Sequence, residues 1–240
     1  MEEALYLKNS YLKEWEAQVV SVNQEKYIVL DKTAFYPNSG GQPYDTGTIT
    51  KISDGKTFRV VYVGKFSGKI SHEVDKEGLQ EGDKVKCNID WDRRYILMRL
   101  HTAAHVISEV INKETGAMIT GNQLDTGKCR IDFSVDEFDR EKLKGYEKIA
   151  NEIISKNIDV TYEFKSREDV LKDPNMTKLA KGLEGLPKEV KILRIVRIGD
   201  FDYQADGGTH VKNTKEIGKI EFIDFVNKGK NNRRIYFKLA

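Results

Sequence analysis

The stretch Trp91-Asp-Arg-Arg-Tyr-Ile-Leu-Met-Arg-Leu-His101-Thr-Ala-Ala-His105-Val-Ile-Ser-Glu-Val-Ile111 decides the fold, because the hydrophobic period of the chain changes there. Upstream of it, short β-rich segments alternate with turns. Within it, apolar residues recur at helical spacing and predict a helix with a buried stripe. We expect Asp92 to cap the start of this helix. The residues of the stripe are Ile96, Leu100, Ala103 or Ala104, Ile107 and Ile111.

Two histidines of this helix, His101 and His105, are four residues apart, so their imidazoles stand on one face about one turn apart. Side chains so placed can bind a single metal ion, and the segment Asp206-Gly-Gly-Thr-His210 offers two further ligands. Gly207 and Gly208 would let Asp206 and His210 face one point. Two other interpretations stay open, namely imidazoles that are hydrogen-bonded on the helix flank and an ordinary turn at the glycines.

The residue that follows the first histidine excludes one class of metal enzyme. A zinc protease of the His-Glu-x-x-His type needs a glutamate there as general base, and this chain has Thr102. Zinc-dependent proteolysis by that route is therefore not expected.

Composition predicts a globular protein of the cytoplasm. Of the 240 residues, 39% are hydrophobic and 32% are charged, and no apolar run reaches the roughly 20 residues of a membrane helix. The amino terminus has no basic-then-apolar export signal. Cys87 and Cys129 are far apart, which argues against a disulfide scaffold or a thiolate cluster, and we expect both to be buried on strands.

The net charge is only +2, but basic residues cluster locally. Arg93, Arg94 and Arg99 lie in the histidine helix, where such a cluster can bind phosphates. Residues 227–238 gather five more basic residues with two aromatic ones. A hairpin turn with a solvated face explains this second cluster at least as well.

The change of period divides the chain into an expected β-barrel-like domain, residues 1–91, and an α+β domain, residues 92–240. Turns rich in Asn, Asp, Gly and Pro separate the expected strands of the first domain. These strands cover residues 18–22, 26–30, 46–52, 57–63 and 84–89. In the second domain we expect strands at 128–133, 160–164, 190–198, 218–225 and 233–239, a helix after residue 134, and short helices at 167–172 and 176–181.

A glycine-rich segment, Phe35-Tyr-Pro-Asn-Ser-Gly40-Gly41-Gln42-Pro, lies between two expected strands. Paired glycines let backbone amides approach a ligand closely, and Gln42 offers both a donor and an acceptor. A nucleic-acid backbone suits such a loop. A tight turn with one polar residue accounts for the same letters.

Three segments of the chain, taken in their order along the sequence, resemble one family. This family comprises the editing domain of alanyl-tRNA synthetase and the free-standing alanyl-tRNA editing proteins of the AlaX class. The segments are Phe35-Tyr-Pro-Asn-Ser-Gly-Gly-Gln-Pro-x-Asp45-x-Gly47, Arg99-Leu-His-Thr-Ala-Ala-His105 and Asp206-Gly-Gly-Thr-His-Val-x-x-Thr214-x-Glu-Ile-Gly218. The chain resembles the intermediate-length members, which have the barrel-like first domain but no aminoacylation core. The resemblance implies hydrolysis of tRNA(Ala) mischarged with serine, or with glycine, with one zinc ion per chain.

By the same resemblance, His101, His105 and His210 match the histidine ligands of the family. Asp206 stands where the family pattern usually has cysteine. A carboxylate is a harder ligand than a thiolate, so Asp206 either binds zinc directly or acts through a water and leaves a three-histidine site. The first domain and the start of the helix would hold the tRNA, through Gly40, Gly41, Gln42, Arg93 and Arg99.

Serine exceeds alanine by one hydroxyl, so an editing site has to form a hydrogen bond with that hydroxyl. Thr120 resembles the family's hydroxyl-sensing position, and Asn122 and Gln123 are further candidates; a polar turn is the other interpretation of all three. The residues assign no general base. Two other functions compete: an RNA-binding module that grips acceptor stems without catalysis, and a hydrolase of another tRNA ester such as peptidyl-tRNA. The oligomeric state is left open.

Overall fold

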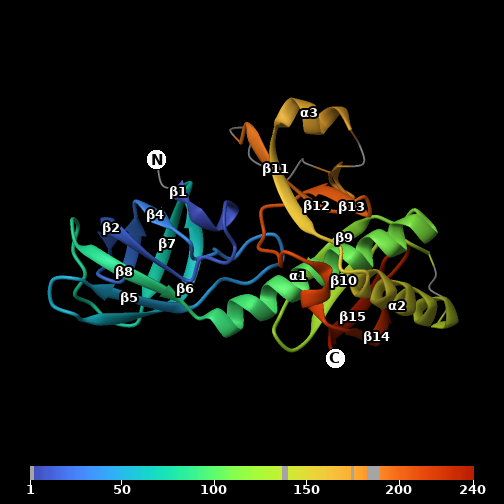
Figure 1. Cartoon of the computed structure of the whole chain (residues 1–240), viewed down its shortest axis with the longest axis horizontal. Coiled ribbons are helices and arrows are strands. Elements are labelled where there is room, and N and C mark those ends of the chain that lie inside the picture. The colour runs from blue at the N-terminus through green and yellow to red at the C-terminus, as the bar shows by residue number, and fades with distance from the viewer. Residues whose placement is uncertain (1–2, 137–139, 174–175, 183–189) are drawn as a thin grey trace. The chain divides into compact units, whose positions relative to one another are not determined.

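A computed structural model of the chain describes residues 3–136, 140–173, 176–182 and 190–240. It divides into two compact units, Met1–Leu97 and Met98–Ala240. Helix α1 (Trp91–Thr115) begins in the first unit and continues in the second (Figure 1). The expected α+β class is confirmed. The expected domain boundary at residue 91 stays a prediction.

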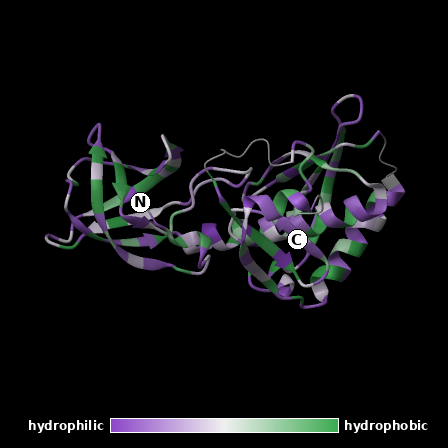
Figure 2. Cartoon of the chain, turned by 90° about the horizontal axis from the view of Figure 1, so that it is seen from above, coloured by the Kyte–Doolittle hydropathy of each residue, from purple (hydrophilic) through white to green (hydrophobic). Residues whose placement is uncertain are grey.

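Six strands of the first unit close into a barrel, as the many short β-rich segments predict. Strand β2 pairs with both β3 and β8, which closes the ring. Buried and exposed residues alternate along β2 and β6. Figure 2 shows hydrophobic and hydrophilic residues mixed within the strands of the chain. In barrel order the strands are β2 (Glu14–Asn23), β3 (Tyr27–Leu30), β7 (Lys69–Val74), β6 (Thr57–Phe66), β5 (Gly47–Lys51) and β8 (Lys84–Ile89).

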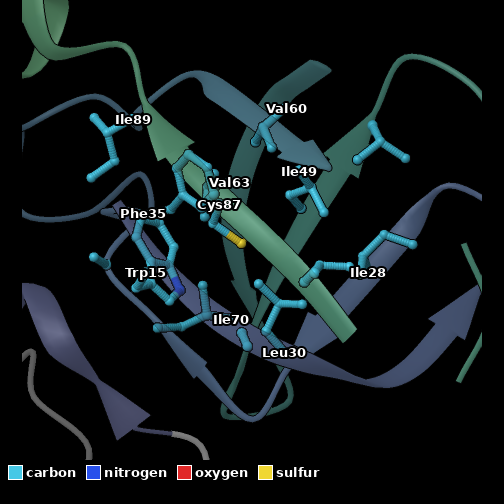
Figure 3. Close-up of a cluster of buried hydrophobic side chains, with 14 of the residues drawn as sticks. Trp15, Ile28, Leu30, Phe35, Ile49, Val60, Val63, Ile70, Cys87 and Ile89 are labelled. Carbon is cyan, nitrogen blue, oxygen red and sulfur yellow. The ribbon is translucent and has the colours of Figure 1, made fainter. Parts of the chain in front are cut away.

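Hydrophobic side chains from these strands, among them Trp15 and Cys87, fill the interior together with Phe35 from the segment between β3 and β5 (Figure 3). A short helix η1 (Leu5–Leu7) and a parallel pair of short strands, β1 (Glu3–Ala4) and β4 (Lys32–Thr33), complete the described part of this unit.

One polar side chain of the barrel, His72 on β7, is fully buried. Its Nδ1 donates to the Ile28 carbonyl at 2.9 Å, so Nε2 carries the lone pair and accepts from the Thr33 hydroxyl at 2.9 Å. Burial lowers the pKa of His72 to about 4, against the hydrogen bond to Ile28, which raises it. His72 is therefore neutral in the folded barrel at neutral pH.

The second unit contains two antiparallel sheets and the helices that cover them. Helix α2 (Arg140–Ser155) contacts β14, and Asn151 on it binds both polar backbone atoms of Ile220 at the start of that strand. None of the helices in the described part of the chain combines the length and the apolar character that crossing a bilayer requires. The larger sheet has the order β14 (Ile220–Asn227), β15 (Arg233–Leu239), β10 (Cys129–Phe133), β9 (Ile119–Gln123), and the smaller one β11 (Val160–Ser166), β12 (Ile192–Ile198), β13 (Asp202–Ala205).

Helix α1 is capped two residues earlier than expected, by Asp90. Asp90 accepts a hydrogen bond from the backbone of Arg93 at 3.3 Å and its carbonyl accepts from Arg94, whereas Asp92 lies inside the first turn. The assignment of Asp92 as the cap is therefore wrong. From residue 100 to residue 111 every side chain of α1 is buried, including the apolar stripe there. Ile96 is half-buried.

Three further expectations concern the carboxy-terminal hairpin, the short helices and the two cysteines. Residues 227–238 form the end of the β14–β15 hairpin, as the solvated-hairpin interpretation expects. Helix α3 (Arg167–Lys172) is confirmed, but residues 177–181 are not helical, because Leu179 pairs with Ile119 in an isolated bridge. Cys87 and Cys129 are both buried on strands, as predicted.

Candidate metal centre

Four side chains with metal-binding atoms converge in the second unit: His101 and His105 on α1, and Asp206 and His210 in the segment that follows β13. Their ligand atoms all lie within 4.8 Å of one another. The ring of His210 is centred 4.4 Å from the ring of His101 and 4.7 Å from the ring of His105. The pair on the helix and the distant Asp-x-x-x-His segment thus meet at one point, as the metal-site interpretation requires.

Strand pairing and one arginine hold the Asp206 segment in place. The Asp206 amide donates to the Arg194 carbonyl at 3.0 Å, which continues the pairing of β13 with β12. The Arg194 guanidinium donates back to the Gly208 carbonyl at 2.8 Å. The Gly208 amide donates to the Asp206 carboxylate at 3.0 Å, so the turn is closed by the candidate ligand itself. These bonds fix where Asp206 and His210 face.

The spacing of the four donor groups is close to that of a tetrahedral zinc shell. Tetrahedral ligands at about 2.0–2.2 Å from the metal are separated from one another by roughly 3.3–3.6 Å. Asp206 Oδ2 lies 3.1 Å from His210 Nε2, 3.5 Å from His101 Nε2 and 3.8 Å from His105 Nε2. The carboxylate therefore stands where a fourth ligand belongs, and small movements of the imidazoles complete the fit.

Asp202, a residue that sequence patterns did not single out, orients His105. His105 Nδ1 donates to Asp202 Oδ2 at 2.9 Å, so Nε2 keeps its lone pair on the side of the cluster. The Gln204 amide donates to the same carboxylate at 2.9 Å. Both residues lie on β13, whose pairing with β12 places them opposite α1 (Figure 1).

Thr102 plays the same part for His210. Its hydroxyl donates to the Met98 carbonyl at 2.9 Å and accepts from the Val211 amide at 3.2 Å. Since its one hydrogen is used, the contact of 3.2 Å with His210 Nδ1 has the imidazole as donor. Nε2 of His210 therefore also carries a lone pair toward the cluster. The residue that excludes a protease mechanism is thus a positioning residue.

Burial and charge in the cluster favour neutral imidazoles at His101 and His210 and an ionised carboxylate at Asp206. Burial lowers the pKa of His101 to about 4 and, together with His101, holds the pKa of His210 well below its usual value. Burial also disfavours the charged form of His105, but the hydrogen bond to Asp202 outweighs it and raises the pKa of His105. Burial would raise the pKa of Asp206, but the neighbouring imidazoles hold it well below its usual value. Neutral nitrogen and anionic oxygen are what a divalent cation needs.

A second buried charge cluster lies behind Asp202. Lys178 Nζ is 2.8 Å from Glu109 Oε2 and 3.9 Å from Asp202 Oδ1, and these three side chains are almost fully buried. Lys113 adds an exposed ammonium 3.2 Å from Glu109. Buried Lys178 and exposed Lys113 together offset the charges of the two carboxylates behind His105.

The predicted tRNA-binding residues are distributed over both units. In the first, Gly40 and Gly41 have positive φ of 59° and 86°, and the Gln42 amide donates to the Ser39 carbonyl, so the loop is a tight turn with Gln42 buried. Arg93 joins this loop, since its Nε donates to the Tyr44 carbonyl at 3.2 Å. In the second unit, Arg99 donates to the Ile217 carbonyl at 2.8 Å.

Arg94 is not available for phosphates, contrary to the interpretation of the arginine cluster. Its guanidinium is fully buried, forms an ion pair with the Asp45 carboxylate, and donates to the carbonyls of Ser10 at 2.9 Å and Ala34 at 2.6 Å. Arg94 therefore fastens the first turns of α1 to the barrel within the first unit.

The predicted selectivity residues lie on β9. Thr120 is the extra residue of a bulge, because Gly121 pairs with Asp132 and Ile119 with Phe133. The exposed Thr120 hydroxyl donates to Asn232 at 3.3 Å, and Gln123 accepts from Arg130. These contacts leave the selectivity roles of Thr120 and Gln123 as predictions.

Comparison with known proteins agrees with the order of the three segments. The family model described as "tRNA synthetases class II (A)" matches residues 5–93, and the one described as "Threonyl and Alanyl tRNA synthetase second additional domain" matches residues 193–236. The alanyl-tRNA editing protein AlaX-M of Methanosarcina barkeri is 52% identical over 244 residues, covering all of both chains. That of Saccharolobus solfataricus is 44% identical over 99% of this chain and 98% of its own.

Full-length ligases are also similar, but only in part. The alanine–tRNA ligase of Pyrococcus abyssi is 37% identical over 91% of this chain, which corresponds to 24% of the ligase. The similarity to the editing proteins covers whole chains, and the similarity to the ligases covers one region.

Proposed function

Because the chain belongs to the alanyl-tRNA editing proteins of the AlaX-M type, which deacylate misacylated tRNA, we propose that it hydrolyses seryl-tRNA(Ala), and also glycyl-tRNA(Ala), in trans with one zinc ion bound. The proposed requirement for zinc is supported by one observation. Three imidazoles and one carboxylate converge in the second unit with their donor atoms close together. The substrate is an ester between an amino acid and the terminal ribose of the tRNA.

His101, His105 and His210 hold the zinc as neutral nitrogen donors in this proposal. Asp202 and Thr102 fix their hydrogen-bonded ring nitrogens, so each oriented ring presents Nε2 to the metal. Zinc, when bound, supplies a Lewis acid that lowers the pKa of water toward about 7. We assign no side chain as general base.

Asp206 is the fourth ligand and binds directly rather than through a water. Its Oδ2 is 3.1–3.8 Å from the three imidazole nitrogens, close to the edge of a tetrahedral zinc shell. A carboxylate that acted through a water would have to lie farther from all three nitrogens.

The first test removes one ligand, in the variant His210→Ala. We expect the variant to lose bound zinc and to lose deacylation of seryl-tRNA(Ala) by more than the roughly 10- to 100-fold that removing an outer partner costs. Zinc content and single-turnover deacylation rates measure the two effects, and circular dichroism verifies the fold.

Alanyl-tRNA(Ala) and peptidyl-tRNA are the control substrates for the wild-type protein. Cleavage of the serine ester in preference to both supports editing. Equal cleavage of all three would point to a general tRNA esterase, and binding without cleavage would point to an RNA-binding module. An unchanged rate in His210→Ala would refute the metal-dependent mechanism.

Selectivity is tested at Thr120, whose hydroxyl we propose recognises the serine side chain. In Thr120→Val the isosteric methyl cannot form a hydrogen bond, so the preference for the serine ester over the alanine ester should fall by about 5- to 10-fold. The rate on the serine ester should change less than the ratio. If the ratio of the two kcat/KM values equals that of the wild type, Thr120 does not recognise the serine hydroxyl.

The residues proposed to contact the tRNA are Gly40, Gly41, Arg93 and Arg99, while Gln42, which is fully buried, would support the turn from inside. The left-handed turn at Gly40 and Gly41 keeps Cβ atoms away from an approaching backbone, and Arg93 adds a positive charge beside it. Arg93 and Arg99 are half-buried, so part of each guanidinium remains accessible to a phosphate.

A further inference from the structure

Two aromatic side chains of β11, Tyr162 and Phe164, are exposed side by side. They expose 43% and 46% of their surface, and their ring centroids are 5.8 Å apart in an edge-to-face arrangement. An exposed aromatic pair on an edge strand leaves apolar surface in water and favours aggregation, unless a ligand or partner covers it. The mechanism described above does not use either residue.

Strand register places this pair on the sheet face that carries the metal ligands. Phe164 pairs with Arg194, and Arg194 pairs with Asp206 through the Asp206 amide. In the next row, Tyr162 pairs with Val196, which pairs with Gln204. Paired residues share one face, and neighbouring strands are about 4.8 Å apart, so Phe164 lies about 10 Å from Asp206 across the sheet.

Arg194 connects the aromatic pair to the metal loop directly. Its guanidinium carbon lies 4.8 Å from the centroid of the Tyr162 ring, while its Nη1 donates to the carbonyls of Gly208 at 2.8 Å and Asp206 at 3.3 Å. A group that stacked on this pair would therefore be placed against the same structure that positions Asp206 and His210.

The opposite face of the sheet is already packed. Val170 and Met176 cover Leu193 and Ile195 there and form a separate hydrophobic cluster. Tyr162 and Phe164 pair with Val196 and Arg194, which alternate with Leu193 and Ile195 along β12. They therefore lie on the face opposite that cluster. They extend the face of the candidate metal centre outward to the sheet edge.

We propose that Tyr162 and Phe164 form the stacking site for the 3′-terminal nucleobase of the tRNA. This proposal rests on the proposed function. The terminal base is attached to the ribose that carries the scissile ester, so its site has to lie within one nucleoside of the metal ligands, and two strand spacings satisfy that requirement. Aromatic rings are the groups on which proteins stack single-stranded bases.

The test uses a hairpin RNA that carries the tRNA(Ala) acceptor stem and ends in adenosine, and the same RNA with an abasic ribose at its 3′ end. Wild-type protein should bind the adenosine RNA about 5- to 50-fold more tightly, a range typical of base–aromatic stacking. Phe164→Ala and Tyr162→Ala should bind both RNAs with nearly the affinity that the wild type has for the abasic one. Phe164→Trp should keep the preference.

Phe66→Ala is the matched control, because Phe66 is a phenylalanine even more exposed, at 56%, on a strand of the other unit, and its loss should leave the preference intact. A wild type that binds the two RNAs equally, or a Phe164→Ala variant that keeps the wild-type preference, would overturn the stacking site. So would a change from dimer to monomer on Phe164→Ala, measured by sedimentation, because a second copy would then be the occupant.

Deacylation separates this proposal from the one on which it rests. Wild-type protein that cleaves seryl-tRNA(Ala) but ignores the terminal base retains the proposed function and loses only the stacking site. In Phe164→Ala, a rise in KM on seryl-tRNA(Ala) with zinc content unchanged is the expected result. A protein that binds the adenosine RNA selectively but cleaves no ester would instead refute the catalytic proposal.

Discussion

Asp206 is the residue at which this chain departs from the cysteine usual in the family pattern. A carboxylate oxygen is harder than a thiolate and holds zinc less tightly at equal geometry. We expect Asp206→Cys to keep the metal and to bind it more tightly than the wild type, whereas Asp206→Ala should lose at least about tenfold in affinity. Competition with a chromophoric chelator measures both, and tighter binding by Asp206→Ala would show that Asp206 is not a ligand.

Asp202 acts through His105, so its substitution should lower the affinity for zinc more directly than it lowers the rate of deacylation. Asp202→Asn keeps the size of the side chain but removes the charge that holds the Nδ1 proton of His105. Affinity for zinc should fall about 10- to 100-fold.

The control for Asp202→Asn is Asp200→Asn, two residues earlier on the chain. Asp200 is fully exposed and makes only a distant ion pair with Arg197 at 3.8 Å, so zinc affinity should not change. Equal affinities in the two variants would mean that the hydrogen bond does not orient the ligand.

At the scale of single elements, β7 places an ionisable group inside the barrel. The folded pKa of His72, about 4, is below its unfolded value of about 6.5, so the folded state binds fewer protons between these values. Its contribution to stability is complete above pH 6.5 and is lost as the pH falls toward 4. Between pH 7 and pH 5 the loss amounts to about 2 kcal/mol.

Urea unfolding of the barrel unit measures this loss. Trp15 and Trp91 are the two tryptophans of the sequence and both belong to the first unit, so their fluorescence reports its unfolding. In His72→Gln, which does not titrate, stability should fall by about 2 kcal/mol less over the same range. Parallel pH profiles for the two proteins would show that His72 is not held neutral.

Two of the strands that sequence patterns missed carry polar residues on a buried face. In β7 the polar inward residue is His72, and in β13 the polar inward residues are Asp202 and Gln204. Alternation of apolar and polar residues cannot reveal a strand whose inward positions are polar. In β13 the polar residues are those that position the candidate metal ligands. Their role at the site therefore removes the hydrophobic alternation by which the strand could be predicted.

At the scale of the whole molecule, the barrel, the α+β unit and the histidine helix all followed from periodicity. The convergence of His101, His105, Asp206 and His210 was predicted from ligand spacing and from the family resemblance, because each pair is local in sequence. Asp202 is 97 residues from its partner His105 and forms no motif with it. Long-range hydrogen bonds of this kind become visible only once the sheet and the helix are placed together.

Arg94 is a residue whose role the sequence predicted wrongly. In sequence it is one arginine of a basic cluster, and such clusters predict phosphate binding. In the fold it is the fully buried partner of Asp45, 49 residues away. Charge alone does not tell a binding residue from a structural one, whereas the burial of the guanidinium does.

The carboxylate at position 206 also changes how the site withstands chemical damage. Zinc centres that contain a thiolate are inactivated when peroxide or an alkylating agent attacks the sulfur. Here the metal ligands contain no sulfur, and burial raises the pKa of both cysteine thiols, that of Cys129 to about 12, so neither is a reactive nucleophile. Metal binding by this chain should therefore persist under oxidative stress that would inactivate a zinc centre with a cysteine ligand.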